Sequence, residues 1–399
     1  MPPAGRGSRL STHWNILSLE YNISPRRGGK MAKLILIGGF LGSGKTTLLA
    51  ETAKKLASQG ETVGLVTNDQ APELVDTRLL RRTGMEVAEV AGSCFCCNFD
   101  GFIHSVQSLI SQGAETVLAE PVGSCTDLSA TVLNPVKKFH HDWNLLPLTV
   151  LVDPRRFLEI FGGQPSRMET DALYIMKLQM EEADRILVSK SDTLSREEKS
   201  QIPTLLKNVF PEKTTGLISA RTGEGMEDWL TPLLVAEDAG TKIVPVDYDR
   251  YAHGEAVLGW LNAAVAVRVQ PEDSPDAAAL LTGLLKAFQS EVQKSGSEIG
   301  HVKAVFNIHQ REFVANLTSL NGTVHVREVP ASGDLKETAN RLIFNARVQM
   351  SPESLELLVR RLFAEILSPF GIEIETLRSL MPGRPNPTHR FSEPAGEKP

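Results

Sequence analysis

The feature that most constrains the fold is an apolar run followed at once by a glycine-rich loop and an amphipathic stretch, KLILIGGFLGSGKTTLLA at residues 33–50. A continuous run such as KLILIGGF is typical of a strand buried on both faces, and LLAETAKKLASQ has helical spacing. Residues 39–46 satisfy the pattern G-x-x-x-x-G-K-[ST] between that strand and that helix. We therefore predict a strand, a phosphate-binding loop and a helix in direct succession.

This loop has the chemistry to hold nucleotide phosphates. Its backbone N–H groups and the helix N-terminus can surround phosphate oxygens. Lys45 would neutralise the β and γ phosphates, and the hydroxyl of Thr46 would hold Mg²⁺. The residues that we expect to contact the nucleotide here are Gly39, Gly42, Ser43, Gly44, Lys45, Thr46 and Thr47.

Short apolar runs and helical stretches then alternate along the chain. The runs are TVGLVTN, TVLAEPVG, PLTVLVDP, ADRILVSKSD and TTGLISA. This alternation predicts an α/β fold, a P-loop NTPase parallel sheet flanked by helices, with ligands beyond the carboxyl ends of the strands. Polar residues stand at those ends, and each acidic one among them could instead cap a following helix. The residues in question are Asn68, Asp69, Glu120, Asp153, Asp192 and Ser219.

The segment VSKSD indicates which base is bound. A carboxylate at Asp192 can accept hydrogen bonds from both guanine N1–H and the 2-amino group, and adenine offers no such donor pair. The segment therefore favours GTP over ATP. Lys190 would lie along the base plane, and Ser189 stands where guanine-binding proteins generally have Asn. The stretch beginning at Ser219 and Ala220 would supply a backbone N–H to the guanine oxygen.

Three of the four cysteines fall within four positions, at Cys94, Cys96 and Cys97. Three thiols this close can converge on one soft or borderline cation, with a fourth position left to a carboxylate, a His or water. Alternatively, buried free thiols pack as small hydrophobic groups. Cys125 is a weaker candidate for the fourth ligand and fits a packed loop residue better. Four cysteines cannot build a disulfide framework for a chain of 399 residues.

Composition excludes several classes of function. The formal charge of −6, from 48 acidic and 42 basic residues, gives no bias towards nucleic acid. No apolar run approaches the roughly 18 residues that a membrane span requires, so we expect no membrane partner and a cytoplasmic location.

Patterns of composition divide the chain into segments. The predicted small C-terminal domain is α+β, and in it His301 and His309 alternate with apolar residues, which is typical of the solvent face of a strand. The first segment is either a disordered leader or a mis-assigned start preceding Met31. The predicted segments are a leader over 1–30, a P-loop GTPase domain over 31–235, a linker over 236–262, the α+β domain over 263–380 and a disordered tail over 381–399.

Four stretches make the chain resemble the CobW-type GTPases, relatives of the nickel chaperones HypB and UreG. They are GGFLGSGKTTLL, the C-x-C-C of the clustered cysteines, EPVG at residues 120–123, and QMEEADRILVSKSD. The resemblance covers about residues 31–235. It implies slow GTP hydrolysis and delivery of a metal, zinc or cobalt, to a client metalloprotein or a cobalamin-related protein.

The same comparison assigns roles to two residues of EPVG. Glu120 occupies the place where many GTPases have an Asp beside Mg²⁺, so we assign it to the ion or its water shell. Gly123 has an N–H group that could sense the γ-phosphate. No convincing general base is evident, which agrees with slow hydrolysis that waits for a partner.

Three features depart from the family pattern. TNDQAPELVDT replaces a segment that usually carries a metal-linked carboxylate, so that role would fall to Asp69, Glu73 or Asp76. Ser189 replaces Asn in the guanine motif. The nine histidines are dispersed, which argues against bulk metal storage.

Two other functions stay open at this point. One is a P-loop phosphotransferase acting on a small molecule, which would need an acceptor pocket and a base. The other is a non-catalytic zinc sensor with nucleotide as a structural ligand. We allow for a homodimer in all three cases.

Overall fold

The first strand and helix form where the apolar run and its glycine-rich loop predict them. In the computed structural model, β1 spans Ala32–Gly39 and α1 spans Lys45–Ser58. Gly44 precedes α1 with φ = 96°, a left-handed conformation that glycine adopts without strain. The structure describes residues 31–69, 80, 84–91, 93–270, 275–329 and 340–396.

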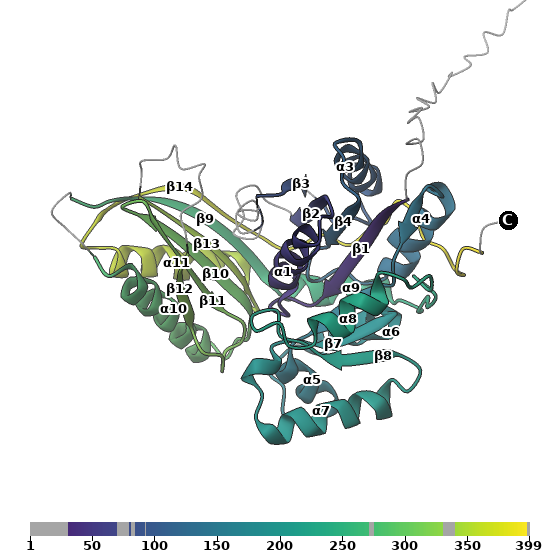
Figure 1. Cartoon of the computed structure of the whole chain (residues 1–399). Coiled ribbons are helices and arrows are strands. Elements are labelled where there is room, and N and C mark those ends of the chain that lie inside the picture. The colour runs from purple at the N-terminus through teal and green to yellow at the C-terminus, as the bar shows by residue number, and fades with distance from the viewer. Residues whose placement is uncertain are drawn as a thin grey trace, which may run out of the picture. The chain divides into compact units, whose positions relative to one another are not determined.

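A parallel sheet of eight strands forms around β1, which confirms the predicted fold class (Figure 1). Its order is β3-β2-β4-β1-β6-β7-β8, and β5 pairs with the start of β1. All of its pairings are parallel, so the carboxyl ends of the strands meet at one edge. The strands are β2 (Val63–Asp69), β3 (Glu86–Ala91), β4 (Thr116–Glu120), β5 (Trp143–Leu145), β6 (Thr149–Val152), β7 (Arg185–Val188) and β8 (Thr214–Leu217).

Helices cover both faces of this sheet, because its central strands are apolar on both sides. On one face, α1 and α8 (Met226–Leu233) pack against side chains such as Ile35 and Leu118. The opposite face packs against the remaining helices of this half of the chain. These are α3 (Phe99–Ser111), the π-helical turn Ser129–Leu133 leading into α4 (Asn134–Phe139), α5 (Pro154–Phe161), α6 (Thr170–Glu182) and α7 (Arg196–Val209).

The second half of the chain forms an antiparallel sheet of six strands in the order β12-β11-β10-β13-β9-β14. One face carries the helices α10 and α11 and an apolar core (Figure 1). Alternate residues of β10 point to the opposite face, which borders the phosphate-binding loop. The elements are β9 (Gly259–Arg268), α10 (Ala277–Lys294), β10 (Ile299–Ile308), β11 (Arg311–Leu317), β12 (His325–Val329), β13 (Arg341–Val348), α11 (Pro352–Ile366) and β14 (Gly371–Leu380).

The predicted linker contains a helix, α9 (Tyr248–Ala256), that packs on α6. Asp171 on α6 accepts hydrogen bonds from Arg250 at 2.8 Å and pairs with His253 at 2.9 Å. These two contacts join the linker to the first half of the chain. Residues 31–399 form one compact unit, and the domain boundaries predicted within that unit stay predictions.

The structure differs from the disordered tail expected over residues 381–399, in the part that it describes. Arg390 forms an ion pair with Asp127 at 2.7 Å, and the backbone N–H of Thr388 donates to the carbonyl of Cys96 at 2.8 Å. Composition does not predict this ordered segment, because a few specific hydrogen bonds and ion pairs hold it in place although it has little apolar surface. The predicted leader over 1–30 lies outside the described residues.

No helix in the described part of the chain combines the length and the apolar character that a bilayer crossing requires. The longest one, α10, has 18 residues and buries its apolar stripe against the second sheet.

Candidate functional site

The phosphate-binding loop brings three predicted residues together at the carboxyl end of the first sheet. Lys45, buried at the start of α1, donates from Nζ to the carbonyl oxygens of Gly39 at 2.8 Å and Phe40 at 3.3 Å. The hydroxyl of Thr46 donates to Oε1 of Glu120 at 3.0 Å. The same carboxylate oxygen lies 4.0 Å from Lys45 Nζ. One cation and two side-chain oxygen atoms therefore converge at the phosphate-binding loop, a combination whose chemistry suits a phosphate and a magnesium ion.

Gly123 lies against this loop. A Cβ atom at Gly123 would stand 2.8 Å from Leu41 Cδ2, 3.0 Å from the backbone nitrogen of Leu41 and 3.1 Å from Lys45 Nζ. Contacts this short require something to move, so only glycine lets EPVG approach the phosphate-binding loop so closely. The contact of the Gly123 N–H group with a γ-phosphate stays a prediction.

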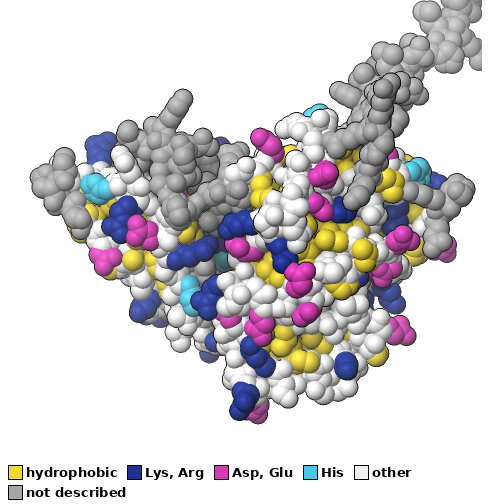
Figure 2. Space-filling model, viewed as in Figure 1, with side chains coloured by type: hydrophobic (Ala, Val, Ile, Leu, Met, Phe, Trp, Pro, Cys, Tyr) yellow, Lys and Arg dark blue, Asp and Glu magenta, His cyan; other side chains and the backbone are white. Residues whose placement is uncertain are grey.

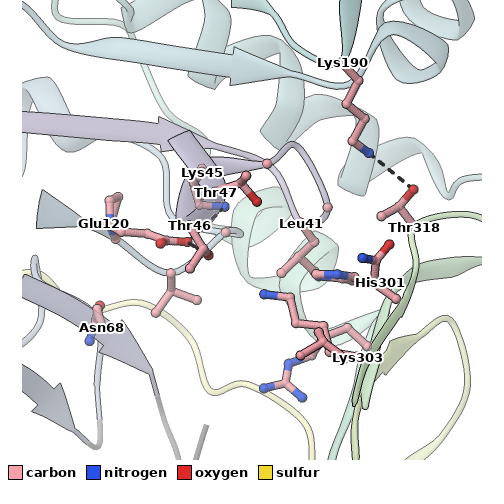
Figure 3. Close-up of a pocket in the computed structure, with 18 of the residues that line it drawn as sticks. Leu41, Lys45, Thr46, Thr47, Asn68, Glu120, Lys190, His301, Lys303 and Thr318 are labelled. Atoms are coloured by element: carbon pink, nitrogen blue, oxygen red, sulfur yellow. Dashed lines mark hydrogen bonds and ion pairs between the residues drawn. The ribbon is translucent and has the colours of Figure 1, made fainter. Parts of the chain in front are cut away.

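The opposite wall of the pocket comes from the second sheet, which the sequence did not indicate (Figure 3). On β10, His301 and Lys303 project into the pocket from the polar face of the strand. In the register of the sheet, Lys303 lies opposite Asn316 on β11, and His301 lies opposite Arg347 on β13. The residues that this sheet and the position just after β11 contribute are Trp260, His301, Lys303, Val314, Asn316, Thr318, Arg327 and Arg347.

Basic side chains dominate this wall. The guanidinium of Arg347 lies 4.2 Å from the centroid of the Trp260 ring and donates to the carbonyl of Leu261 at 3.2 Å. Burial and then the cations Lys303, Lys190, Lys45 and Arg347 lower the pKa of His301 well below its ordinary value. His301 is therefore neutral at pH 7, in a pocket whose charged groups favour an anion.

The position of His301 differs from the solvent-face assignment that its strand pattern favours. Alternation along β10 showed that His301 and Lys303 share a face, and that face meets the phosphate-binding loop instead of water. His309 is exposed, as predicted. Basic side chains also border the hollow at the centre of the face shown in Figure 2.

The residues predicted to bind the base form two neighbouring groups. Lys190 pairs with Asp153 at 2.6 Å and donates to Thr318 at 3.4 Å, and it lines the pocket. Asp192 accepts a hydrogen bond from Ser219 Oγ at 2.6 Å and pairs with Arg221 at 2.6 Å. The pKa of Asp192 is lowered, since these partners outweigh its partial burial.

The clustered cysteines occupy a tight turn between β3 and α3. The N–H groups of Cys97 and Asn98 donate to the carbonyl of Cys94 at 3.0 and 2.9 Å. Asn98 then caps α3 by accepting from Gly101 N at 3.1 Å. This geometry turns the thiols towards one another, so the sulfur atoms of Cys94, Cys96 and Cys97 all lie within 4.8 Å of each other.

Asn68 fixes this turn to the first sheet. Its amide donates to the carbonyls of Val90 at 2.8 Å and Ser93 at 2.7 Å, and its oxygen accepts from Phe95 N at 3.0 Å. Asn68 also lines the phosphate pocket (Figure 3). One residue therefore borders the pocket and, through its side chain, holds the thiol turn.

Mutual hydrogen bonds shift the pKa values of the clustered thiols in different directions. Hydrogen bonds from Cys125, Cys96 and Cys97 lower the pKa of Cys94. The hydrogen bond with Cys94 raises the pKa of Cys97 to about 11. The tail lies beside this cluster, where Asn386 N donates to the sulfur of Cys97 at 3.3 Å.

The pocket gathers most of the predicted nucleotide residues, whose roles stay predictions. The thiol cluster and the group around Asp192 lie outside the pocket lining. Asp69 is the last residue of β2, and Glu73 and Asp76 lie outside the described residues. The predicted residues that line the pocket are Gly42, Gly44, Lys45, Thr46, Thr47, Glu120, Gly123 and Lys190.

Comparison with known proteins gives one family match and one curated relative. Residues 33–215 match the model of the CobW/HypB/UreG nucleotide-binding domain. The zinc-regulated GTPase metalloprotein activator 1 of Dictyostelium discoideum is 22% identical over 217 residues, which are 47% of this chain and 45% of that protein. The match thus spans less than half the length of this relative.

Solved structures give similarities at low identity. HypB from Helicobacter pylori in complex with nickel is 18% identical, with a TM-score of 0.37, over 51% of this chain and 86% of that one. The Zn(II)-bound YjiA GTPase from E. coli is 13% identical, with a TM-score of 0.33, over 85% of this chain and 99% of that one.

Proposed function

Because residues 33–215 match the model of the CobW/HypB/UreG nucleotide-binding domain, we propose that this chain binds and slowly hydrolyses GTP in order to hold and release a metal ion. The ion is zinc or cobalt, and it is cargo for a client metalloprotein or cobalamin-related protein. Cys94, Cys96 and Cys97 bind it.

In this proposal the phosphate pocket binds GTP with Mg²⁺. Lys45 exchanges its carbonyl partners for the β and γ phosphates, and Thr46 and Glu120 hold the magnesium ion or its water shell. Asp192 accepts the guanine N–H groups, for which Arg221 has to give way. The name of the Dictyostelium relative, a zinc-regulated GTPase, supports both the nucleotide and the metal.

The observation that carries the proposal is the double contact of Asn68. Asn68 lines the phosphate pocket, and the three hydrogen bonds of its side chain hold the strand end and the turn that bear the thiols. A change in the position of Asn68 when nucleotide binds would therefore be passed to the turn. Nucleotide state and metal affinity are coupled through this residue.

The sulfur geometry suits a tetrahedral metal ion. With metal–sulfur bonds of about 2.3 Å, two sulfur ligands of a tetrahedral site are about 3.8 Å apart. Cys96 and Cys97 have a separation of 3.8 Å, whereas Cys94 and Cys96 are at 2.9 Å and would have to open by about 1 Å. Thiolates favour a soft or borderline cation, which fits zinc or cobalt.

A competition titration tests the proposal. Zn²⁺ and Co²⁺ are titrated against a chromophoric chelator, with GDP and with a non-hydrolysable GTP analogue, in the wild type and in the Cys94→Ser, Cys96→Ser, Cys97→Ser variant. We expect the wild-type affinity to differ by about 5- to 150-fold between the two nucleotide states and to fall below neutral pH. Equal binding by the wild type and the triple variant would refute the thiol site.

Turnover assays separate this function from the two alternatives. GTP and ATP hydrolysis are measured with and without Zn²⁺ or Co²⁺. A phosphotransferase would need a small-molecule acceptor and ignore these ions. A zinc sensor would bind metal and nucleotide without turnover.

A further inference from the structure

The docked tail, residues 384–395, follows β14 and ends beside α4, where Figure 1 shows it in yellow. Its middle part contacts the thiol turn. Thr388 N donates to the carbonyl of Cys96 at 2.8 Å, and Asn386 N donates to the sulfur of Cys97 at 3.3 Å. Cys97 is half-buried, whereas the other two clustered thiols are buried. The docked tail therefore lies on the thiol that is most open to solvent.

The adjacent side chains of Arg390 and Phe391 anchor the docked tail. Arg390 Nε donates to Oδ2 of Asp127 at 2.7 Å, and the side chain of Asp127 is only 1% exposed. Phe391 N donates to the carbonyl of Ala130 at 3.0 Å, and the ring of Phe391 lies 6.4 Å from that of Phe139 on α4. A buried carboxylate is costly unless a cation pairs with it, so the site at Asp127 selects a basic side chain.

The residue before this pair adds an aromatic contact. The ring of His389 packs edge-on against Phe99, with centroids 5.1 Å apart, and lies 5.2 Å from the ring of Phe139. Phe99 is the first residue of α3, and Phe139 is the last residue of α4. Three successive side chains of the docked tail, a ring, a cation and a ring, thus each meet a partner of matching chemistry.

The receptor side of this contact is held by the first half of the chain. Asp127 has φ = 63°, a left-handed conformation that is costly for most residues other than glycine. The hydroxyl of Tyr248 donates to the Asp127 carboxylate at 2.7 Å. On either side, Thr126 Oγ1 and Ser129 N donate to the carboxylate of Glu182 at 2.9 and 2.8 Å. Backbone strain persists where the surroundings impose it, and it concentrates at binding sites.

The docked tail has few other constraints. Its residues all belong to the described part of the chain and form neither a helix nor a strand, so its release disrupts no such element. Pro385, Pro387 and Pro394 keep a released segment extended, which lowers the entropic cost of binding it again. A specific receptor and an extended, terminal ligand are the two parts of a reversible peptide contact.

We propose that the surface around Asp127, Phe99 and Phe139 is a docking site for an extended peptide with an aromatic–arginine–aromatic sequence. The chain's own docked tail occupies this site as a strap that shields Cys97. A client that takes metal from the thiols has to displace the strap. That last step rests on the proposed function, whereas the docking and the shielding do not.

Alkylation of the metal-free chain tests the shielding. The full chain is treated with iodoacetamide in the presence of a chelator, and mass spectrometry follows the labelling of Cys97. In Arg390→Met, which removes the ion pair with Asp127, we expect labelling to be at least about tenfold faster, since hydrogen bonds between charged groups contribute that much to the closed state. His389→Ala should show a smaller increase. Melting curves identify any variant that is unfolded, and the other variant then decides.

Arg311→Met is the matched control. Arg311, on β11, also pairs with a carboxylate, that of Glu328 at 2.7 Å, and also lies over a ring, that of Phe313 at 5.0 Å. We expect wild-type labelling of Cys97 in this variant. Wild-type labelling in a folded Arg390→Met protein as well would overturn the shielding.

A peptide added in trans tests the docking site. A fluorescent peptide of residues 384–396 is titrated into wild-type and Arg390→Met protein. We expect tighter binding to Arg390→Met, whose own tail no longer competes, and slower labelling of Cys97 when the site is filled. The same peptide with methionine in place of its arginine should not bind. Failure of the wild-type peptide to bind Arg390→Met would show that the contact is a fixed structural anchor and would overturn the docking site.

These measurements use no metal and no nucleotide, so they are independent of the proposed function. If the triple cysteine variant binds metal like the wild type, the proposed thiol site fails, and the labelling and peptide results still decide the docking site. If the thiol site stands but the peptide does not bind, only the present inference fails.

Discussion

Gly123→Ala probes the closest contact between EPVG and the phosphate-binding loop. The added Cβ would meet Leu41 Cδ2 at 2.8 Å, Leu41 N at 3.0 Å and Lys45 Nζ at 3.1 Å. The backbone of Gly123 lies outside the left-handed region, so the effect is one of space and not of φ. Leu41 Cδ2 can rotate away, but the backbone nitrogen belongs to the loop itself.

The magnitude follows from the cost of that overlap. Extra methyl groups in a packed region typically cost about 1–3 kcal/mol. If the loop relieves the overlap by shifting, nucleotide binding has to reverse the shift, so the same energy appears as lost affinity. This corresponds to a decrease of about 5- to 150-fold. The GTP analogue should lose more than GDP, because Gly123 lies near the expected γ-phosphate.

The assay is a fluorescence titration with a labelled GDP and a labelled, non-hydrolysable GTP analogue. Gly216→Ala, on β8 of the same sheet, is the control, because its Cβ would meet only Leu187 Cδ2 at 3.4 Å, an ordinary contact. Wild-type affinity for both nucleotides in a folded Gly123→Ala protein would show that this contact does not control the phosphate site.

Four further predictions concern single side chains. Lys45→Ala should weaken GTP binding by about 2–3 kcal/mol with little change in melting temperature, and undiminished hydrolysis would end the phosphate-loop assignment. Asp192→Asn should weaken GTP binding and favour binding of a xanthine nucleotide, as measured by competition. Arg347→Leu should weaken binding of the GTP analogue more than binding of GDP, because the substitution removes a cation from the pocket wall. Equal losses of affinity for the two nucleotides would argue for a packing role alone. Burial raises the pKa of Glu182 from 4.5 to about 8, so this carboxyl group ionises less readily in the folded than in the unfolded protein. The free energy of unfolding therefore falls as pH rises from about 4.5 to 8. Glu182→Gln should remove this loss, worth at most about 5 kcal/mol, in denaturant melts at pH 5 and pH 8, and an unaltered pH profile would contradict the assignment.

The sequence by itself determined the features that depend on short stretches of chain. The phosphate-binding loop occupies residues 39–46, and its strand and helix are contiguous with it, so one local pattern fixes all three. The alternation of apolar runs with helices fixed the parallel sheet, because parallel strands need crossover connections. The thiol turn was equally visible, since its three cysteines fall within residues 94–97.

Only the tertiary structure decided which distant segments meet these local features. Alternation along β10 places His301 and Lys303 on one face, but the packing of the second sheet decides that this face borders the phosphate pocket. Likewise, Gly123 lies against the phosphate-binding loop because β4, which precedes it, pairs with β1 in the sheet. These contacts depend on strand order and register. In the case of the second sheet they join residues more than a hundred positions apart, so the residues next to each one in the sequence do not indicate them.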